Sequence, residues 1–413
     1  MNLISREEAK SKIEQIIKYN DPIKTGIVLP IKKRKSFDVY AIPLEYLVPN
    51  IYNDRIAWKT REFEAFNNRE LSLENNDDIE YIYKLILDES PNDNERTLKD
   101  LAEKGQLVDG IITSDGIIID GNRRATLLRK LFLGDAKKYN ENIENFRYFN
   151  AIVLTGDFSR SEIMSLETQI QIGEDRKVDY NPINIYIKVD NLTKVGYNDR
   201  QIASFMNVQE TDVKNKREIF GLMNEYLSSI GKENHFTLLD GLEDQFINTR
   251  NIFKKLDNNT YITHDDWEYT EDDIVDFKQV CYDFLRSKFE GKKYREILLG
   301  RPNKSDGVFI KKDVWERFKD NHEKIIEKND PQNEADWERL GNNQFVSNLK
   351  NASKELEDTI QEKTVTSLIE RIHTQIRNLS ELLKTQDEIV TNDLDTLDLI
   401  RKELVSILKE FKK

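Results

Sequence analysis

Residues 120–124, Asp-Gly-Asn-Arg-Arg, have the side chains and the spacing of an anion-binding turn. The apolar run 117–119 precedes them and apolar residues at helical spacing follow, so we expect a strand, a tight turn and a helix. Two arginines then lie in the first helical turn, where unpaired N–H groups already carry partial positive charge. This arrangement favours a bound phosphate. The alternative is that one arginine pairs with Asp120 or Asp109 and the motif only fixes the turn.

Weaker motifs stand in a fixed order around this turn. Residues 42–50 and 53–55 form a strand pattern followed by a Pro/Asn/Arg loop, and residues 98–116 follow the pattern of a helix, a glycine turn and a strand hairpin. Residues 172–179 form a link to a later helical segment. As an ordered set over roughly residues 36–225, these motifs resemble the ParB/sulfiredoxin superfamily, specifically a ParB N-terminal domain followed by a helix-turn-helix.

The resemblance implies a fold, a ligand and a set of site residues. The fold is an α+β N-terminal ParB/sulfiredoxin-like domain followed by all-α domains that include a helix-turn-helix. The ligand is a nucleoside triphosphate, CTP or ATP, with Mg²⁺. The implied nucleotide- or phosphate-binding residues are Gly105, Gln106, Gly121, Asn122, Arg123 and Arg124, and the resemblance assigns no metal ligand.

Two residues depart from the family pattern. Asn122 stands where partition-type ParB proteins carry a glutamate that is associated with the nucleotide and its magnesium. This departure argues against efficient hydrolysis of a triphosphate. The only cysteine, Cys281, is far outside the turn in which sulfiredoxins carry a reactive cysteine, so sulfinic-acid reduction is excluded.

Residues 197–220 follow the pattern of a helix-turn-helix. Asn198 or Asp199 is suited to cap the first helix. Asn207 is suited to the left-handed conformation that the turn requires, and Val208 is expected to fill the gap between the helices. An ordinary αα-hairpin is the alternative interpretation of the same pattern.

The second helix of this motif is expected to enter the major groove of DNA. The residues expected on its exposed side, facing the bases, are Gln209, Thr211, Lys214 and Asn215. The residues expected to contact flanking phosphates are Lys194, Arg200, Lys216 and Arg217. Residues 194–217 contain five basic and three acidic side chains, whereas the whole chain has a net charge of −13. The locally basic segment favours a nucleic-acid surface.

The 413 residues predict a chain of roughly two to four domains. Residues 1–160 are interpreted as the ParB/sulfiredoxin-like domain with an accessory N-terminal helix, and residues 161–235 as the helix-turn-helix domain. Residues 236–350 are interpreted as a helical domain of unknown role, and residues 351–413 as a C-terminal helical hairpin. The single cysteine and the charged N-terminus predict a cytoplasmic protein, and no apolar stretch has the length of a membrane helix.

The C-terminal segment carries apolar residues at heptad-like spacing. One stripe runs from Val365 to Leu382 and a second from Leu394 to Phe411, with a polar break predicted at residues 391–393. The stripe is wider than a two-stranded coiled coil requires, so we expect a helical hairpin that packs on the body of the protein or on a second subunit. We therefore expect a homodimer.

Three functional hypotheses follow. The leading one is a ParB-like protein that binds double-stranded DNA and is gated by a nucleotide bound at residues 121–124. The second is a nuclease or nucleotide hydrolase of a plasmid or phage-defence system, in which Asp120 would bind a metal and Arg123 the phosphate. The third is an interaction scaffold that uses its C-terminal helices.

Overall fold

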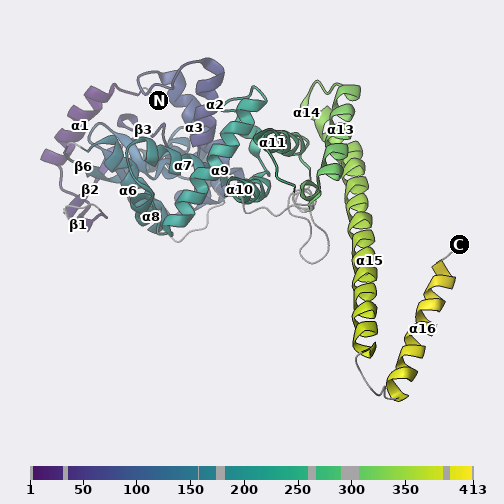
Figure 1. The fold of residues 1–413 in the computed structure, drawn as a ribbon. Coiled ribbons are helices and arrows are strands. Elements are labelled where there is room, and N and C mark those ends of the chain that lie inside the picture. Colours follow the sequence, from purple (N-terminus) through teal and green to yellow (C-terminus); the bar gives the residue numbers. More distant parts are fainter. Residues whose placement is uncertain are drawn as a thin grey trace. The chain divides into compact units, whose positions relative to one another are not determined.

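The structure is a computed structural model, and it divides into two compact units, residues 1–260 and residues 261–413 (Figure 1). The segments predicted as residues 1–160 and 161–235 both lie within the first unit, and the segment predicted as residues 236–350 spans the division. Most of the link predicted at residues 172–179 lies outside the described residues. The residues that the structure describes are 3–30, 36–156, 158–173, 182–258, 267–289, 307–384 and 391–411.

Within the described part of the first unit, six strands form one mixed sheet in the order β1-β2-β6-β4-β5-β3. The pairs β1–β2, β2–β6 and β4–β5 are antiparallel, and the pairs β4–β6 and β3–β5 are parallel. The strands are β1 (Lys24–Val28), β2 (Ser36–Pro43), β3 (Val48–Pro49), β4 (Gly110–Thr113), β5 (Ile117–Asp120) and β6 (Tyr148–Leu154).

Both faces of the sheet are covered, because the alternating residues of its strands are apolar on both sides. Ile112 and Ile118 belong to the cluster that includes residues of helices α4 (Pro91–Lys104) and α5 (Asn122–Phe132). Their strand neighbours Ile111 and Ile119 belong to the opposite cluster, which includes Leu166 of helix α6 (Arg160–Gly173). Helices α5 and α6, which both carry site residues, are therefore held on opposite faces of one sheet.

The remaining helices of the first unit include one N-terminal helix, an inserted pair and the helix-turn-helix region. Ser5 caps the first of them by accepting a hydrogen bond from the Glu8 backbone N–H at 3.2 Å. Their bounds are α1 (Arg6–Tyr19), α2 (Ala57–Asn67), α3 (Asn76–Glu89), α7 (Pro182–Lys194), α8 (Asp199–Met206), α9 (Glu210–Ser229) and α10 (Glu243–Asp257), with short 3-10 helices at Leu44–Tyr46, Asp135–Tyr139, Ile143–Phe146 and Phe236–Leu239.

The second unit is helical in its described residues. Its core contains stacked aromatic rings around His322, which is 1% exposed. Its elements are α11 (Glu271–Arg286), a 3-10 helix at Val308–Ile310, α13 (Lys312–Asn329), α14 (Glu334–Leu340), a π-helix at Gly341–Phe345, α15 (Val346–Lys384) and α16 (Thr391–Phe411).

The structure confirms a mixed α/β N-terminal region followed by a mainly helical region. It corrects the predicted break at residues 391–393, because α16 already begins at Thr391. Thr, Asn and Asp are suited to the start of a helix as well as to a loop, which explains the error. No helix in the described part of the chain is both long enough and apolar enough to cross a lipid bilayer.

Candidate functional site

The expected strand, turn and helix are present at residues 117–132. Strand β5 ends at Asp120, Gly121 adopts a left-handed conformation with φ of 89°, and α5 begins at Asn122. A side chain at Gly121 would place its Cβ 2.8 Å from the Phe149 ring. Glycine is therefore required both for the backbone conformation and for the close approach. Gly121 offers no side chain to cap α5, so the helix N-terminus keeps N–H donors of the kind that bind anions.

Asn122 is 3% exposed, and its amide joins the loop after β3 to strand β5. Its Oδ1 accepts a hydrogen bond from the Asn50 backbone N–H at 2.9 Å, and its Nδ2 donates to the Ile118 carbonyl at 2.9 Å. Both ends of the amide are therefore engaged within the protein. In this structure Asn122 positions the turn rather than offering a donor to a ligand.

The two arginines of the turn differ in their surroundings. Arg124 donates to Asp120 Oδ2 at 2.8 Å and to the Asp109 carbonyl at 3.3 Å. Asp109 also pairs with Lys24 at 2.7 Å. Arg123 lies half-buried in the first turn of α5. The arrangement includes the pairing with Asp120 that the sequence left open as an alternative, and it engages the carboxylate that the enzyme hypothesis assigned to a metal.

Gly105 and Gln106 lie at the end of α4, beside the sheet. Gly105 has a φ of 71° and its backbone N–H closes the helix on the Leu101 carbonyl. The Gln106 amide pairs with the backbone of Asn150 in β6, donating at 2.8 Å and accepting at 2.8 Å. Gln106 therefore extends the hydrogen bonding of the sheet in this structure.

A buried polar cluster that the sequence did not predict lies behind the turn. Asn50 Nδ2 donates to Glu167 Oε2 at 3.3 Å, and Lys188 pairs with Asp54 at 2.5 Å. Glu167 is 3% exposed. Burial, and next the nearby Asp54 carboxylate, raise the pKa of Glu167 well above its ordinary value. The cluster joins the loop after β3, α6 and α7 to the Asp-Gly-Asn-Arg-Arg turn.

The only sequence signal for this cluster was the Pro/Asn/Arg loop at residues 49–55, which contains Asn50 and Asp54. Glu167 and Lys188 lie in helices with no distinguishing motif. Their contacts with the loop join residues more than a hundred positions apart in the chain, so local patterns could not reveal them.

Residues 198–229 form two helices joined by a short turn, as the predicted helix-turn-helix and the alternative αα-hairpin both require. Asn198 caps α8 in a reciprocal capping box with Gln201, in which each side chain accepts from the other residue's backbone N–H at 3.0 Å. Asn207 ends α8 in the left-handed conformation, with φ of 50°. Val208 is 37% exposed, so the prediction that it fills the gap is wrong. The residues that pack between the helices are Ile202, Ala203, Met206 and Val213.

The predicted DNA-contacting residues on α9 divide into two groups. Gln209, Thr211 and Lys214 are exposed. Asn215 is half-buried and accepts a hydrogen bond from Arg250 of α10, and the ammonium of Lys216 lies 5.9 Å from the centre of the Tyr186 ring. The structure therefore leaves the first group exposed, whereas Asn215 and Lys216 contact neighbouring helices.

The other predicted phosphate contacts also differ from one another. Arg217 pairs with Asp199 at 2.6 Å and so bridges α9 to α8. Lys194 pairs with Asp190 at 2.9 Å within α7. Arg200 is exposed and has no ion pair with any described residue.

No group of three or more His, Cys, Asp or Glu side chains within the described ranges is arranged to hold a metal ion. The chain matches no protein-family model and no curated protein sequence. In its described residues the chain has a mixed α/β N-terminal region followed by a mainly helical region.

Proposed function

We propose that this protein binds double-stranded DNA through α8 and α9. The observation that supports the proposal is that three predicted contact residues at the start of α9 are exposed after a left-handed turn: Gln209 at the N-cap, and Thr211 and Lys214 in the helix. A second helix in this position enters the major groove with its N-terminal residues against the base edges. We expect Arg200, an exposed residue at the start of α8, to contact the adjacent phosphates.

The net charge of the chain restricts attraction to DNA to a local surface. The chain carries a net charge of −13, so the body of the protein repels DNA, and attraction must come from the few cations of the α8–α9 surface. We therefore expect binding that weakens with rising salt, with a small slope of log K against log salt because only a few phosphates are contacted. Each phosphate contact contributes about −0.9 to the slope of log K against log salt.

The test begins with selection of a binding site from a random duplex library, followed by fluorescence anisotropy on the selected duplex. Lys214→Ala should lower affinity by about 1–3 kcal/mol if the lysine contacts a base, and Thr211→Ala should relax the preference at one position. Arg200→Ala should reduce the salt slope by about one and weaken all sequences alike.

The matched control is Lys12→Ala, because Lys12 is an exposed lysine of α1, away from the proposed surface. It should leave both affinity and salt slope unchanged. The proposal is wrong if no duplex is selected at low salt, or if Lys214→Ala and Lys12→Ala have the same affinity as the parent protein.

We further propose that the N-terminus of α5 holds the phosphate of a nucleotide, CTP or ATP, which gates DNA binding. The uncapped helix start at Gly121 and the nearby Arg123 side chain support a phosphate site. The residues fit Mg²⁺ less well, since the side chains of Asp120 and Asn122 are both engaged inside the protein. The enzyme hypothesis, which needs Asp120 as a metal ligand, therefore has no structural observation in its favour.

Calorimetric titration with CTP and ATP, with and without Mg²⁺, tests the nucleotide proposal. Binding should be lost in Arg123→Ala and kept in Arg371→Ala, which removes an exposed arginine of the second unit. Equal heats in the parent and in Arg123→Ala would contradict it. Magnesium should have little effect on affinity, because the turn lacks free carboxylates for the metal.

We propose a homodimer formed through the C-terminal helices. Apolar side chains of α15 are 37–60% exposed, and such a stripe is typical of a helix that packs against another helix. Ile372→Asp should shift the mass measured by sedimentation equilibrium from dimer to monomer, and a monomeric parent protein would contradict the proposal. The exposed stripe of α15 comprises Val365, Leu368, Ile369, Ile372, Ile376 and Leu379.

A further inference from the structure

A cavity that includes no residue of the Asp-Gly-Asn-Arg-Arg turn lies in the first unit among α2, the start of α6 and the end of α7. Its volume is about 570 Å³, which falls in the range of small-molecule sites. Its lining is rich in charge of both signs. The residues on which the argument rests are Tyr52, Arg61, Glu64, Glu70, Arg160 and Lys194.

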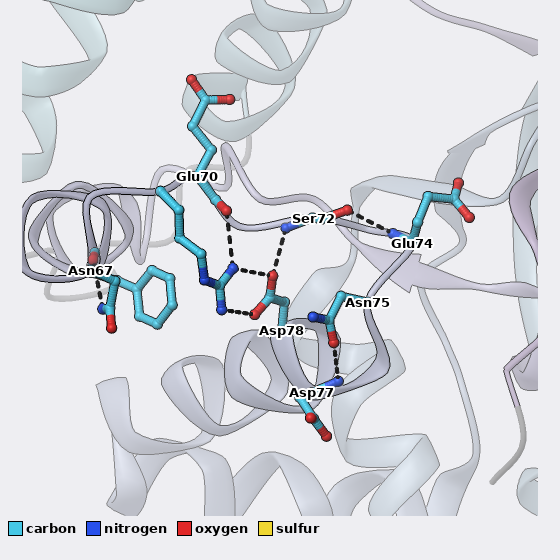
Figure 2. A network of polar contacts seen from close by, with 9 residues as sticks. Asn67, Glu70, Ser72, Glu74, Asn75, Asp77 and Asp78 are labelled. Atoms are coloured by element: carbon cyan, nitrogen blue, oxygen red, sulfur yellow. Dashed lines mark hydrogen bonds and ion pairs between the residues drawn. The ribbon is translucent and has the colours of Figure 1, made fainter.

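The loop on one side of the cavity is held in place by an ion pair. Arg69 forms two hydrogen bonds of 2.7 Å with the Asp78 carboxylate, which also accepts from the Ser72 backbone N–H at 2.9 Å. Figure 2 shows the Glu70 carboxylate directed away from Asp78 and outside this network. The charge of Arg69 is thus satisfied within the protein, and the Glu70 side chain stays outside this network.

The cations that line the cavity exceed the carboxylates with which they form ion pairs. Arg61 and Lys194 share one carboxylate, Asp190, at 2.7 Å and 2.9 Å. The Arg160 guanidinium lies 4.0 Å from the centre of the Tyr52 ring and has no hydrogen bond or ion pair with any described residue. A guanidinium stacked on a ring keeps its N–H edge available for a carboxylate or phosphate.

The carboxylates of the cavity are likewise not neutralised by an ion pair. Glu64 and the Glu70 side chain have no hydrogen bond or salt bridge with any residue in the described ranges. Burial, and next the charge of Glu70, raise the pKa of Glu64, while the charges of Arg61 and Arg160 lower it in part. A positive group between the two carboxylates would remove this repulsion.

We propose that this cavity binds a small zwitterion of the α-amino-acid type, with its carboxylate on Arg160 and its ammonium between Glu64 and Glu70. A simple anion would face the two glutamates, and a simple cation would face Arg160 and Lys194. A ligand with both charges offers a charge-assisted partner to both sets of side chains. The polar lining and the three asparagines, Asn68, Asn191 and Asn234, suit such a ligand.

The experiment measures thermal stabilisation of the full-length protein by each common α-amino acid and by glycylglycine, followed by calorimetry with the best of them. Acetate, ethylamine and inorganic phosphate serve as single-charge probes. We expect stabilisation by an amino acid and none by the single-charge probes. Arg160→Ala and Glu64→Gln should each weaken binding by about tenfold or more, while Arg371→Ala should have no effect.

Glycylglycine separates two sources of the same chemistry, since it keeps both charges but holds them further apart. Stronger binding of the dipeptide would identify the cavity as a site for the ends of peptides. Stronger binding of a free amino acid would identify it as a site for single amino acids. Either result supports the proposal. Stabilisation by phosphate or acetate alone overturns it in favour of an anion site. No stabilisation by any zwitterion, or equal binding by Arg160→Ala, also overturns it.

Discussion

Asn122 provides the sharpest test of how the turn is built. Asn122→Ala removes the acceptor for the Asn50 N–H and the donor to the Ile118 carbonyl, both at 2.9 Å in a buried position. A buried polar group that loses its partner costs about 1–3 kcal/mol. The two losses together should therefore lower the local stability of β5 and α5 by about 2–4 kcal/mol.

Hydrogen exchange followed by mass spectrometry measures this change where it occurs. Peptides from β5 and α5 should exchange faster in Asn122→Ala, while peptides from the second unit should not change and serve as an internal control. Asn321→Ala is the matched variant, because Asn321 is exposed and has no side-chain hydrogen bond with any described residue. It should leave exchange unchanged throughout.

Asn122→Asp separates the acceptor from the donor. The carboxylate still accepts from the Asn50 N–H, but when ionised it repels the Ile118 carbonyl, and only the protonated form donates to it. The pKa of the new carboxyl in the folded protein should therefore exceed its unfolded value of about 3.9. The variant should be most stable below that pH and lose protection as the pH rises through the folded pKa. Unchanged protection in Asn122→Ala, together with lost nucleotide binding, would refute the structural role.

Three further predictions concern packing and charge. Gly110→Ala should destabilise the first unit by about 1–3 kcal/mol, because its Cβ would lie 2.2 Å from the Phe149 ring. Gly221→Ala should stabilise the same unit by about 0.5–1 kcal/mol, because the new Cβ on α9 would lie in open space. Urea titration measures both changes. Because the pKa of Glu167 is raised in the folded protein, the parent protein should lose stability as the pH rises from the ordinary value of about 4.3 toward the folded pKa. Glu167→Gln removes this titration, so the variant should be more stable than the parent above neutral pH, and its stability should depend less on pH. Asp283→Ala should destabilise the second unit by about 3 kcal/mol, because it removes the carboxylate 3.0 Å from buried His322; thermal unfolding followed by near-ultraviolet circular dichroism measures it.

Local signals were sufficient for the elements that carry the candidate sites. The apolar run 117–119 before Asp120-Gly121 predicted the end of β5 and the start of α5, and Asn198 and Asn207 predicted the cap and the end of α8. These features depend on neighbours within a few residues, where propensity and capping decide the structure.

The partners of the site residues were not predictable in the same way. The engagement of Asn122 with Asn50 joins positions 72 residues apart, and that of Asn50 with Glu167 joins positions 117 apart. An asparagine in a turn has the same local pattern whether its amide faces a ligand or the protein. Only the tertiary arrangement shows that Asn122 is used for positioning and that Arg160, which carried no motif, lies in a charged cavity.

Arg61 and helix α7 contact both the cavity and helix α9 of the proposed DNA surface, so binding at the two sites can be coupled. Arg61 of the cavity lies 5.8 Å from the centre of the Phe220 ring in α9 and also pairs with Asp190 of α7, while α7 packs directly against α9. A ligand that moves Arg61 or Asp190 would therefore act on α9. If the ligand changes DNA affinity by some factor, DNA must change ligand affinity by the same factor. Measuring amino-acid affinity with and without the selected duplex tests this coupling, and equal affinities would show that the two sites are independent.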